Sequence, residues 1–263
     1  MRGATRALGP LVRLWFRPRL EGLENLPDGP FLLVANHSGG MAFAEIASFV
    51  LAWAEHTRLE RPLAGYAHTI GFRVFPLSWV LGRVGAIPST YEAAYETLGG
   101  GVPILMFPGG DHEAFRPIWR AHEVDFGGRK GFLRIARRMN VPIVPMGIRG
   151  SHVTVPTFWR SRLLPWLLVL PRAVGVKRWP VTLLGLAGAA AIAIAVPLAW
   201  WWRAALAWAW LVSAAQFLPV IPSPIRMRIG APLPPDALFG EDDASLDRAL
   251  ARVEGEVQSL VDP

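Results

Sequence analysis

The sequence contains no cysteine in its 263 residues. This absence excludes a disulfide framework, a cysteine nucleophile and a zinc site with thiolate ligands. It also removes the usual sign of an oxidising or reducing compartment, so the redox environment stays open. Among the remaining side chains, histidine has the ordinary pKa best suited to general-base chemistry near neutral pH.

Charge is also scarce: charged residues make up 18% of the chain, whereas hydrophobic residues make up 52% and include 12 tryptophans. This composition is apolar for a soluble enzyme and indicates contact with a membrane. The charge that is present is unbalanced, with a formal net value of +7. Anionic lipid headgroups and nucleic acid both attract such a surface. Because no basic motif interleaved with aromatic residues is present, we expect a membrane and no nucleic acid as partner.

The first histidine of the sequence, His37, lies in the stretch from residue 31 to residue 45. Residues 31–35 form a short apolar run after a turn-forming Pro-Asp-Gly-Pro segment, which predicts a buried strand of a parallel sheet. His37 then follows the carboxyl end of a strand, the edge where open α/β sheets bind ligands. Gly39 and Gly40 let the backbone approach a substrate closely. His37 is therefore either a general base or a histidine that only hydrogen-bonds its loop.

Two further apolar runs, residues 103–107 and 141–148, have the length and flanking turn residues of buried strands. Helical segments separate them from one another and from the first strand. Strands that alternate with helices predict an α/β fold with a mostly parallel central sheet flanked by helices. We expect a single such domain over residues 21–263, which is long enough to bury a sizeable core.

Three motifs, in order, resemble those of the glycerolipid acyltransferase superfamily. The first is Asn36-His37, the third runs from Met106 to Glu113 as Met-Phe-Pro-Gly-Gly-Asp-His-Glu, and the fourth is the Val-Pro-Ile-Val-Pro segment at residues 141–145. The Pro-Gly-Gly-x-x-Glu pattern is similar to that of the mono- and diacylglycerol acyltransferase-like branch. The resemblance spans residues 22–150, and a weaker similarity to the family is present at residues 226–233.

This resemblance implies an enzyme that moves an acyl group from acyl-coenzyme A or acyl-carrier protein to a lipid hydroxyl, in glycerolipid synthesis or remodelling. It implies no bound cofactor and no metal. His37 would be the base. The family's usual acid, five residues after the histidine, is replaced here by Ala42. Glu45 is the first available carboxylate, and Glu113 or Asp111 are substitutes. A weakened or inactive lipid-binding protein of the same fold is the alternative function.

The resemblance also implies where substrate binds. Backbone amides near Gly39, Gly40 or Gly110 would stabilise the oxyanion. Relatives that act on phosphorylated acceptors carry arginines where this chain has Tyr91 and His112, which favours a neutral acceptor such as a mono- or diacylglycerol or another lipid alcohol. The full set of expected substrate-binding residues is Asn36, Ser38, Gly39, Gly40, Arg83, Tyr91, Gly109, Gly110, Asp111, His112, Arg116, Arg129 and Lys130.

Other arginines of the sequence are candidates for binding a phosphate group of a substrate. Arg83, in the second motif at residues 82–92, and Arg116, just after the third motif, stand close enough in sequence to replace the missing arginines. Arg129 and Lys130 precede a basic helix over residues 131–138, which either binds phosphates of coenzyme A or is simply a solvated basic face.

Two segments are candidates for membrane attachment. Residues 1–20 place arginines among apolar residues, which predicts either a basic amphipathic helix on a membrane surface or an ordinary packed helix. Residues 179–225 hold two uncharged runs separated by Arg203, each long enough to span a bilayer. The prolines at 197 and 219 leave a re-entrant or interfacial hairpin as the close alternative to two spans, and a buried helix pair as the third. Flanking cations place the catalytic domain on the cytoplasmic face.

The last part of the chain is expected to be structural. Acidic residues 241–243 can cap a helix over residues 244–260. The oligomeric state stays open.

Overall fold

The computed structural model describes residues 2–37, 39–40, 43–73, 75, 77–173, 175–240 and 244–262. A seven-stranded sheet forms its centre, in the order β1-β9-β6-β2-β5-β3-β4. Neighbouring strands are parallel except for β6 and β9, which are antiparallel. The expected mostly parallel sheet is therefore confirmed. Its strands are β1 (Arg19–Glu21), β2 (Leu32–Ala35), β3 (Ala64–Ala67), β4 (Ala86–Pro88), β5 (Ile104–Met106), β6 (Ile143–Arg149) and β9 (Arg226–Ile229).

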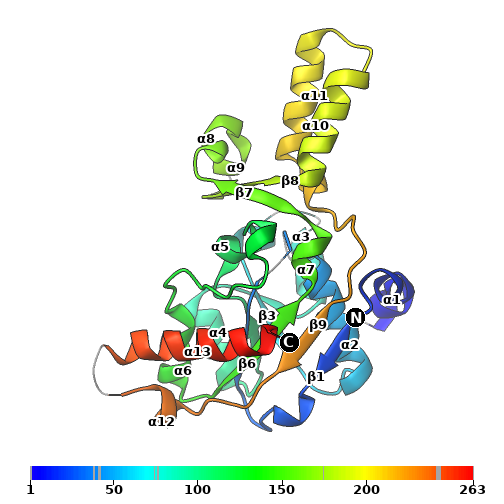
Figure 1. Ribbon diagram of the computed structural model, residues 1–263. Helices are drawn as coiled ribbons and strands as arrows, with labels where there is room; N and C mark the ends of the chain where they lie inside the picture. Colours follow the sequence, from blue (N-terminus) through cyan, green and yellow to red (C-terminus); the bar gives the residue numbers. More distant parts are fainter. Residues whose placement is uncertain are drawn as a thin grey trace.

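Helices cover both faces of this sheet (Figure 1). Helices α4, α6 and α13 pack on one face, and α1 and α2 pack on the other. The helices of the main body are α1 (Arg2–Phe16), α2 (Phe43–Thr57), α3 (Leu77–Arg83), α4 (Tyr91–Gly99), α5 (Gly110–Ala114), α6 (Gly131–Met139), α7 (Ser151–Thr154), α12 (Pro235–Leu238) and α13 (Ser245–Val261). Short 3₁₀ turns are η1 (Leu23–Asn25), η2 (Thr69–Phe72), η3 (Ile118–Arg120) and η4 (Ala214–Phe217).

The central strand β2 shows why its sequence is continuously apolar. Leu32 and Val34 point into the cluster under α4, α6 and α13, whereas Leu33 and Ala35 point into the cluster under α1 and α2. All four side chains are fully buried. Because successive side chains of a strand alternate between faces, a strand covered on both sides has no polar positions.

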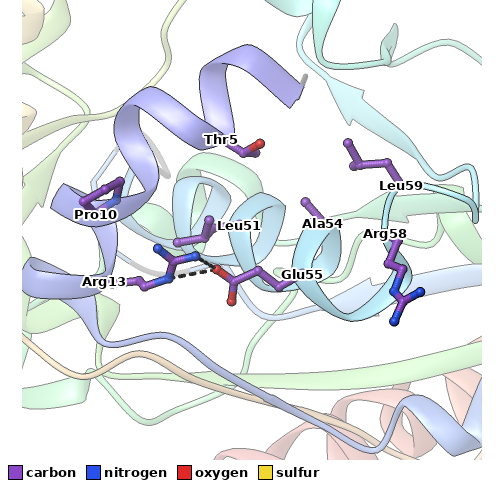
Figure 2. Close-up of a pocket in the computed structure, with 8 residues that line it drawn as sticks. All are labelled: Thr5, Pro10, Arg13, Leu51, Ala54, Glu55, Arg58 and Leu59. Carbon is purple, nitrogen blue, oxygen red and sulfur yellow. Dashed lines mark hydrogen bonds and ion pairs between the residues drawn. The ribbon is translucent and has the colours of Figure 1, made fainter.

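Helix α1 ends at Phe16, so it is shorter than the segment 1–20 expected from the sequence, and Arg19 and Leu20 belong to β1 instead. The helix packs against α2, where Gly9 comes close to Leu51. Arg13 forms an ion pair with Glu55 in a cleft of about 370 Å³ between the two helices (Figure 2). Three leucines of α1 remain exposed, namely Leu8, Leu11 and Leu14.

An arm follows the fourth motif and projects from the main body (Figure 1). It begins with an antiparallel ribbon in which Ser161 pairs with Trp179. Trp179 and Phe217 pack with Phe115 beneath the ribbon, which joins the arm to the third motif. The arm contains β7 (Thr157–Ser161), α8 (Leu164–Leu168), α9 (Leu170–Ala173), β8 (Trp179–Thr182), α10 (Leu183–Ala195) and α11 (Trp200–Val212).

Helices α10 and α11 form the expected hydrophobic hairpin, but within narrower bounds than residues 179–225. The first uncharged run starts as strand β8, and Thr182 then caps α10 by accepting a hydrogen bond from the Gly185 amide at 2.9 Å. Each helix has 13 residues. Within the described part of the chain, no helix is both long and apolar enough to cross a bilayer, so neither run forms the spanning helix expected of it.

The carboxyl-terminal helix α13 lies directly on β6. A Cβ added to Gly147 would stand 2.6 Å from the backbone carbonyl carbon of Leu260, a distance that only glycine permits. Helix α13 begins at Ser245, close to the predicted start, and the acidic residues 241–243 lie outside the described residues.

Candidate active site

His37 lies in the loop that joins β2 to α2, at the carboxyl end of the central strand. The residue before it fixes this loop to the neighbouring strand β6. Asn36 donates a hydrogen bond to the Ile148 carbonyl at 2.9 Å and accepts one from the Ile148 amide at 2.7 Å. Its side-chain amide is buried and bonded on both sides, so Asn36 positions the loop, and its predicted contact with substrate stays a prediction.

Glu45 meets the imidazole of His37. The two form a short hydrogen bond between Nδ1 of His37 and Oε1 of Glu45. Helix α2 begins at Phe43, which places Glu45 in its first turn and turns its fully buried carboxylate back toward the loop. Ser151 of α7 donates a hydrogen bond to the other carboxylate oxygen at 3.2 Å. The first motif thus has a carboxylate eight residues after its histidine.

The electrostatics of this pair suit a general base. Burial alone would lower the pKa of His37, but the adjoining Glu45 carboxylate more than offsets that effect and raises the pKa above 6.5. A carboxylate on Nδ1 holds the proton at that nitrogen and leaves Nε2 as the basic atom. In the described part of the chain Nε2 has no hydrogen-bond partner, and the ring stacks on Phe107 with centroids 4.8 Å apart.

Glu113, the other candidate acid, binds the backbone of the loop and not the imidazole. Its Oε2 accepts a hydrogen bond from the His37 amide at 2.9 Å. Its Oε1 accepts one from the Asp125 amide at 3.1 Å and lies 3.3 Å from Arg116. Burial raises the pKa of Glu113 to about 7, although these partners oppose the shift. Glu113 therefore ties the third motif to the first.

Arg116 is paired in the interior. Its side chain is only 3% exposed and faces Glu113, and it also donates to the Asp125 carbonyl at 3.4 Å. Phosphate binding by Arg116 stays a prediction, and the structure shows this guanidinium already engaged by Glu113 and Asp125.

Two of the three glycine amides expected at the oxyanion are bonded within the site. The Gly40 amide donates to the Ala114 carbonyl at 3.1 Å, and the Gly110 amide donates to the Phe107 carbonyl at 3.2 Å. Gly39 remains as the candidate. It has φ 84°, and a Cβ there would stand 2.4 Å from the Ser151 carbonyl oxygen, so this position requires glycine.

The third motif is held by arginines. Arg129 donates to the Gly109 carbonyl at 2.7 Å and forms an ion pair with Asp111. Arg178, from the segment before β8, binds the other oxygen of Asp111 at 3.1 Å. His112 hydrogen-bonds Asp125 through Nε2 at 2.7 Å. Asp111 and His112 are thus already engaged by protein groups.

Other expected residues contact groups other than His37 and Glu45. Arg83 is exposed and stacks on Trp79 of its own helix at 3.7 Å. Lys130 pairs with Asp247 of α13 at 2.5 Å. Tyr91 begins α4, where its ring stacks on Tyr95. Ser38 lies outside the described residues.

Sequence reasoning missed Ser151, Asp125 and Arg178. A signal for Ser151 was available, because it directly follows Gly150 at the end of strand β6, the same sheet edge that carries His37. Arg178 gave no local signal, because it is 67 residues from Asp111 in the sequence.

Comparison with known proteins identifies the family. The acyltransferase family model matches residues 17–149, just over half of the chain. The chain belongs to the acyltransferase family. The predicted resemblance is therefore confirmed, and the match contains the loop of His37 and the third and fourth motifs. It ends before the arm.

Relatives of this acyltransferase-family chain are known from bacteria and animals. An uncharacterized protein of Mycobacterium tuberculosis is 31% identical over 202 residues, covering 74% of this chain and 54% of the relative. The "DGAT1/2-independent enzyme synthesizing storage lipids" of Mus musculus is 25% identical over 154 residues, covering 59% of this chain and 45% of that enzyme. The chain thus spans about half the length of these relatives.

A solved structure shares the fold. The crystal structure of the 1-acyl-sn-glycerophosphate acyltransferase PlsC from Thermotoga maritima aligns with a TM-score of 0.54 over 99% of this chain and 80% of that one, at 16% identity. At this identity the likeness supports the α/β fold of the acyltransferase family alone.

Proposed function

We propose that the protein is an O-acyltransferase that moves a fatty acyl group from an acyl thioester to a lipid hydroxyl. The observation that carries the proposal is the contact of Glu45 with Nδ1 of His37 at the carboxyl end of β2. A buried carboxylate that orients a histidine is the arrangement that general-base catalysis needs. It supplies the acid that the sequence lacks at residue 42, and so favours an active enzyme over the inactive lipid-binding alternative.

The reaction needs no acyl-enzyme intermediate. Nε2 of His37 accepts the proton of the acceptor hydroxyl while its oxygen attacks the thioester carbonyl carbon. Glu45 stabilises the imidazolium that forms. The tetrahedral intermediate then expels the thiolate, which takes the proton from His37 and leaves as free thiol. The Gly39 amide is our candidate oxyanion donor. The donor is acyl-coenzyme A or acyl-carrier protein, and no bound cofactor takes part.

We favour a neutral acceptor, such as a mono- or diacylglycerol or another lipid alcohol. The family resemblance implies that Tyr91 and His112 occupy the positions of the arginines in relatives with phosphorylated acceptors. The two arginines considered as substitutes have other contacts: Arg116 is buried against Glu113, and Arg83 stacks on Trp79.

We also propose that the arm attaches the enzyme to a membrane, with the catalytic domain on the cytoplasmic face. A helix of 13 residues is about 20 Å long, which suits insertion into one leaflet of a hydrocarbon core about 30 Å thick. Arg203 donates to the Ala193 carbonyl at 2.7 Å, so the one charge of the hairpin is partly satisfied within it. The large exposed apolar side chains of the hairpin are Leu183, Leu186, Ile194, Leu198, Trp200, Trp201, Trp202, Leu206 and Trp208.

An acceptor screen tests the proposed reaction. Purified protein in lipid vesicles receives palmitoyl-coenzyme A and one acceptor at a time, and released thiol is measured. We expect release that depends on the acceptor and is faster with monoacylglycerol than with the matched acylglycerol phosphate. If no acceptor supports release while the protein still binds lipid, the inactive alternative is correct.

A further inference from the structure

Asp111 sits between two guanidinium groups from distant parts of the chain. Arg129 precedes α6, and Arg178 precedes β8. Arg178 Nη1 lies 3.1 Å from one carboxylate oxygen of Asp111, and Arg129 binds the other oxygen. Burial alone would raise the pKa of Asp111, but the two arginines lower it, so the carboxylate is ionised at neutral pH.

A third arginine, Arg160, lies on the ribbon near Arg178 and Asp125. The ribbon register pairs Arg160 with Pro180, two residues beyond Arg178. Arg160 Nη1 is buried and has no hydrogen-bond partner among the described residues. Burial and the neighbouring Arg178 and Arg116 lower the pKa of Arg160. A buried guanidinium nitrogen without an acceptor is costly, and native structures rarely leave one unsatisfied.

The charges of the cluster do not balance. Arg129, Arg160 and Arg178 contribute three positive charges, whereas Asp111 and Asp125 contribute two negative ones. Arg116 and Arg120 also act on Arg160, but each is paired with its own carboxylate, Glu113 and Glu123. Asp125 is itself engaged, because it binds His112 and accepts a hydrogen bond from the Gly127 amide at 2.8 Å. The cluster therefore has an excess of one positive charge and an unused donor on Arg160.

We propose that Arg160 and Arg178, together with Arg129, bind a phosphate group carried by a substrate of the transfer reaction. Guanidinium groups match the oxygens of a phosphate and form strong charge-assisted hydrogen bonds with them. Arg129 connects this site to the reaction centre, since it also holds the Gly109 carbonyl of the third motif. The inference rests on the proposed function, but the two arginines of the ribbon lie outside the matched family segment.

The phosphate has two chemical sources. Coenzyme A and the prosthetic group of acyl-carrier protein both carry phosphates, and a phosphorylated acceptor carries one as well. A neutral acceptor leaves the thioester donor as the source. A purely structural role would account for the Arg178–Asp111 pair, which fastens the ribbon to α5, but not for the unpartnered nitrogen of Arg160.

Binding of coenzyme A to the full chain, measured by calorimetry in detergent, tests the site. We expect Arg160→Gln and Arg178→Gln each to weaken binding by about tenfold or more, the usual effect of losing a charge-assisted contact. The matched control is Arg162→Gln, which removes the same charge from an exposed position just past β7 and should bind as the unaltered protein does. Asp111→Asn should strengthen binding, because it removes the competing carboxylate.

The ligand panel separates the sources. Pantetheine, which lacks phosphate, should be insensitive to all these variants. If only the affinity for an acylglycerol phosphate falls, and that for monoacylglycerol does not, the phosphate belongs to the acceptor. Unchanged affinities for coenzyme A and acylglycerol phosphate in both variants overturn the site. If Arg160→Gln does not fold, two other variants test the phosphate site. These are Arg160→Lys, which keeps the charge, and Arg178→Gln. Arginine-dependent binding without thiol release would refute the proposed function and leave the site standing.

Discussion

Glu45 reaches His37 from the first turn of α2. Gly39 and Gly40 both adopt positive φ, and α2 begins at Phe43, so a carboxylate eight residues after the histidine returns to its ring. From the sequence, three carboxylates were candidates and spacing alone did not separate them. The choice depends on the backbone of a loop, which is a property that residue patterns describe poorly.

Replacing Glu45 by glutamine should slow the chemical step. We expect Glu45→Gln to reduce kcat by about 10² to 10⁴ with little change in KM, because the glutamine does not stabilise the imidazolium. The rate should fall as pH decreases through the raised pKa of His37, because only neutral imidazole acts as a base. In Glu45→Gln that limb should move to lower pH. Steady-state kinetics against pH provide the measurement.

Glu55→Gln is the matched control, because Glu55 lies on the same helix but is 40% exposed and pairs with Arg13. It should leave kcat and the pH profile unchanged. An unshifted pH profile in Glu45→Gln would show that Glu45 does not act on His37.

Glu113 should matter for stability more than for proton transfer. Glu113→Ala leaves the buried Arg116 without its partner and the His37 and Asp125 amides without an acceptor. We expect the free energy of unfolding to fall by about 3–5 kcal/mol, as when a buried ion pair loses one member. Urea denaturation measures this. Glu123→Ala, which removes an exposed carboxylate, should leave the midpoint unchanged, and an equally small effect of Glu113→Ala would contradict the assignment.

Among the elements, the arm departs most from what its sequence suggested. Residues 179–202 contain no charge and were expected to form one long helix. Trp179–Thr182 pairs with β7 instead, through a register set by residues about 20 positions away. Such pairing between distant segments is not visible in hydropathy. The sequence predicted two apolar segments that meet at Arg203, but Arg203 lies inside α11, and the two helices are joined at residues 196–199, around Pro197.

Removing the hairpin should release the protein from membranes without unfolding it. The chain on either side of residues 183–212 comes together, since Thr182 Oγ1 donates to the Gln216 carbonyl at 3.3 Å and Trp179 Nε1 donates to the Leu211 carbonyl at 3.0 Å, so a short Gly-Ser linker can replace them. We expect the shortened protein to lose vesicle binding that resists high salt, because apolar burial and not charge provides that binding. Sedimentation with vesicles measures it.

Serine substitution of Trp200, Trp201 and Trp202 keeps both helices and should weaken the same binding only in part. Salt-resistant binding that persists in the shortened protein would place membrane attachment elsewhere in the chain.

The packing of α13 on β6 predicts opposite effects on stability for alanine substitutions at two glycines. Gly147→Ala should destabilise the fold, because its Cβ would stand 2.6 Å from the Leu260 backbone. Gly255→Ala lies in the interior of α13 with open space around it, so it should stabilise by about 0.5–1 kcal/mol through helix propensity. Thermal unfolding of both variants compares them directly. Equal effects of the two substitutions would contradict this packing.

At the scale of the whole molecule, the order of motifs along the sequence predicted the core of the sheet. Apolar runs at 31–35, 103–107 and 141–148 became β2, β5 and β6, three adjacent strands of the sheet. The edge beyond β6 was not predictable in the same way. Strands β1 and β9 have three and four residues, and they pair across more than 200 residues of sequence, as Arg19 with Arg226.

The functional residues likewise divide into those that local sequence predicts and those that depend on contacts between distant segments. His37 was predictable because the first motif directly follows strand β2, at the carboxyl edge of the sheet. The role of Asn36 in positioning the loop was not predictable, because its bond to Ile148 joins residues 112 positions apart. Arg160 and Arg178 looked like flanks of a membrane segment, and only the folded ribbon brings Arg178 to Asp111 and Arg160 near Arg178.

Thiol release from palmitoyl-coenzyme A by the unaltered protein and by His37→Ala, with the best acceptor of the screen, tests the central claim most directly. His56→Ala, which removes an exposed histidine from the far end of α2, serves as the control and should be fully active. We expect His37→Ala to fold normally and to lose activity by about 10² to 10⁴, the range of general-base contributions. Acceptor-dependent release by His37→Ala at the unaltered rate would contradict the assignment of His37 as the catalytic base.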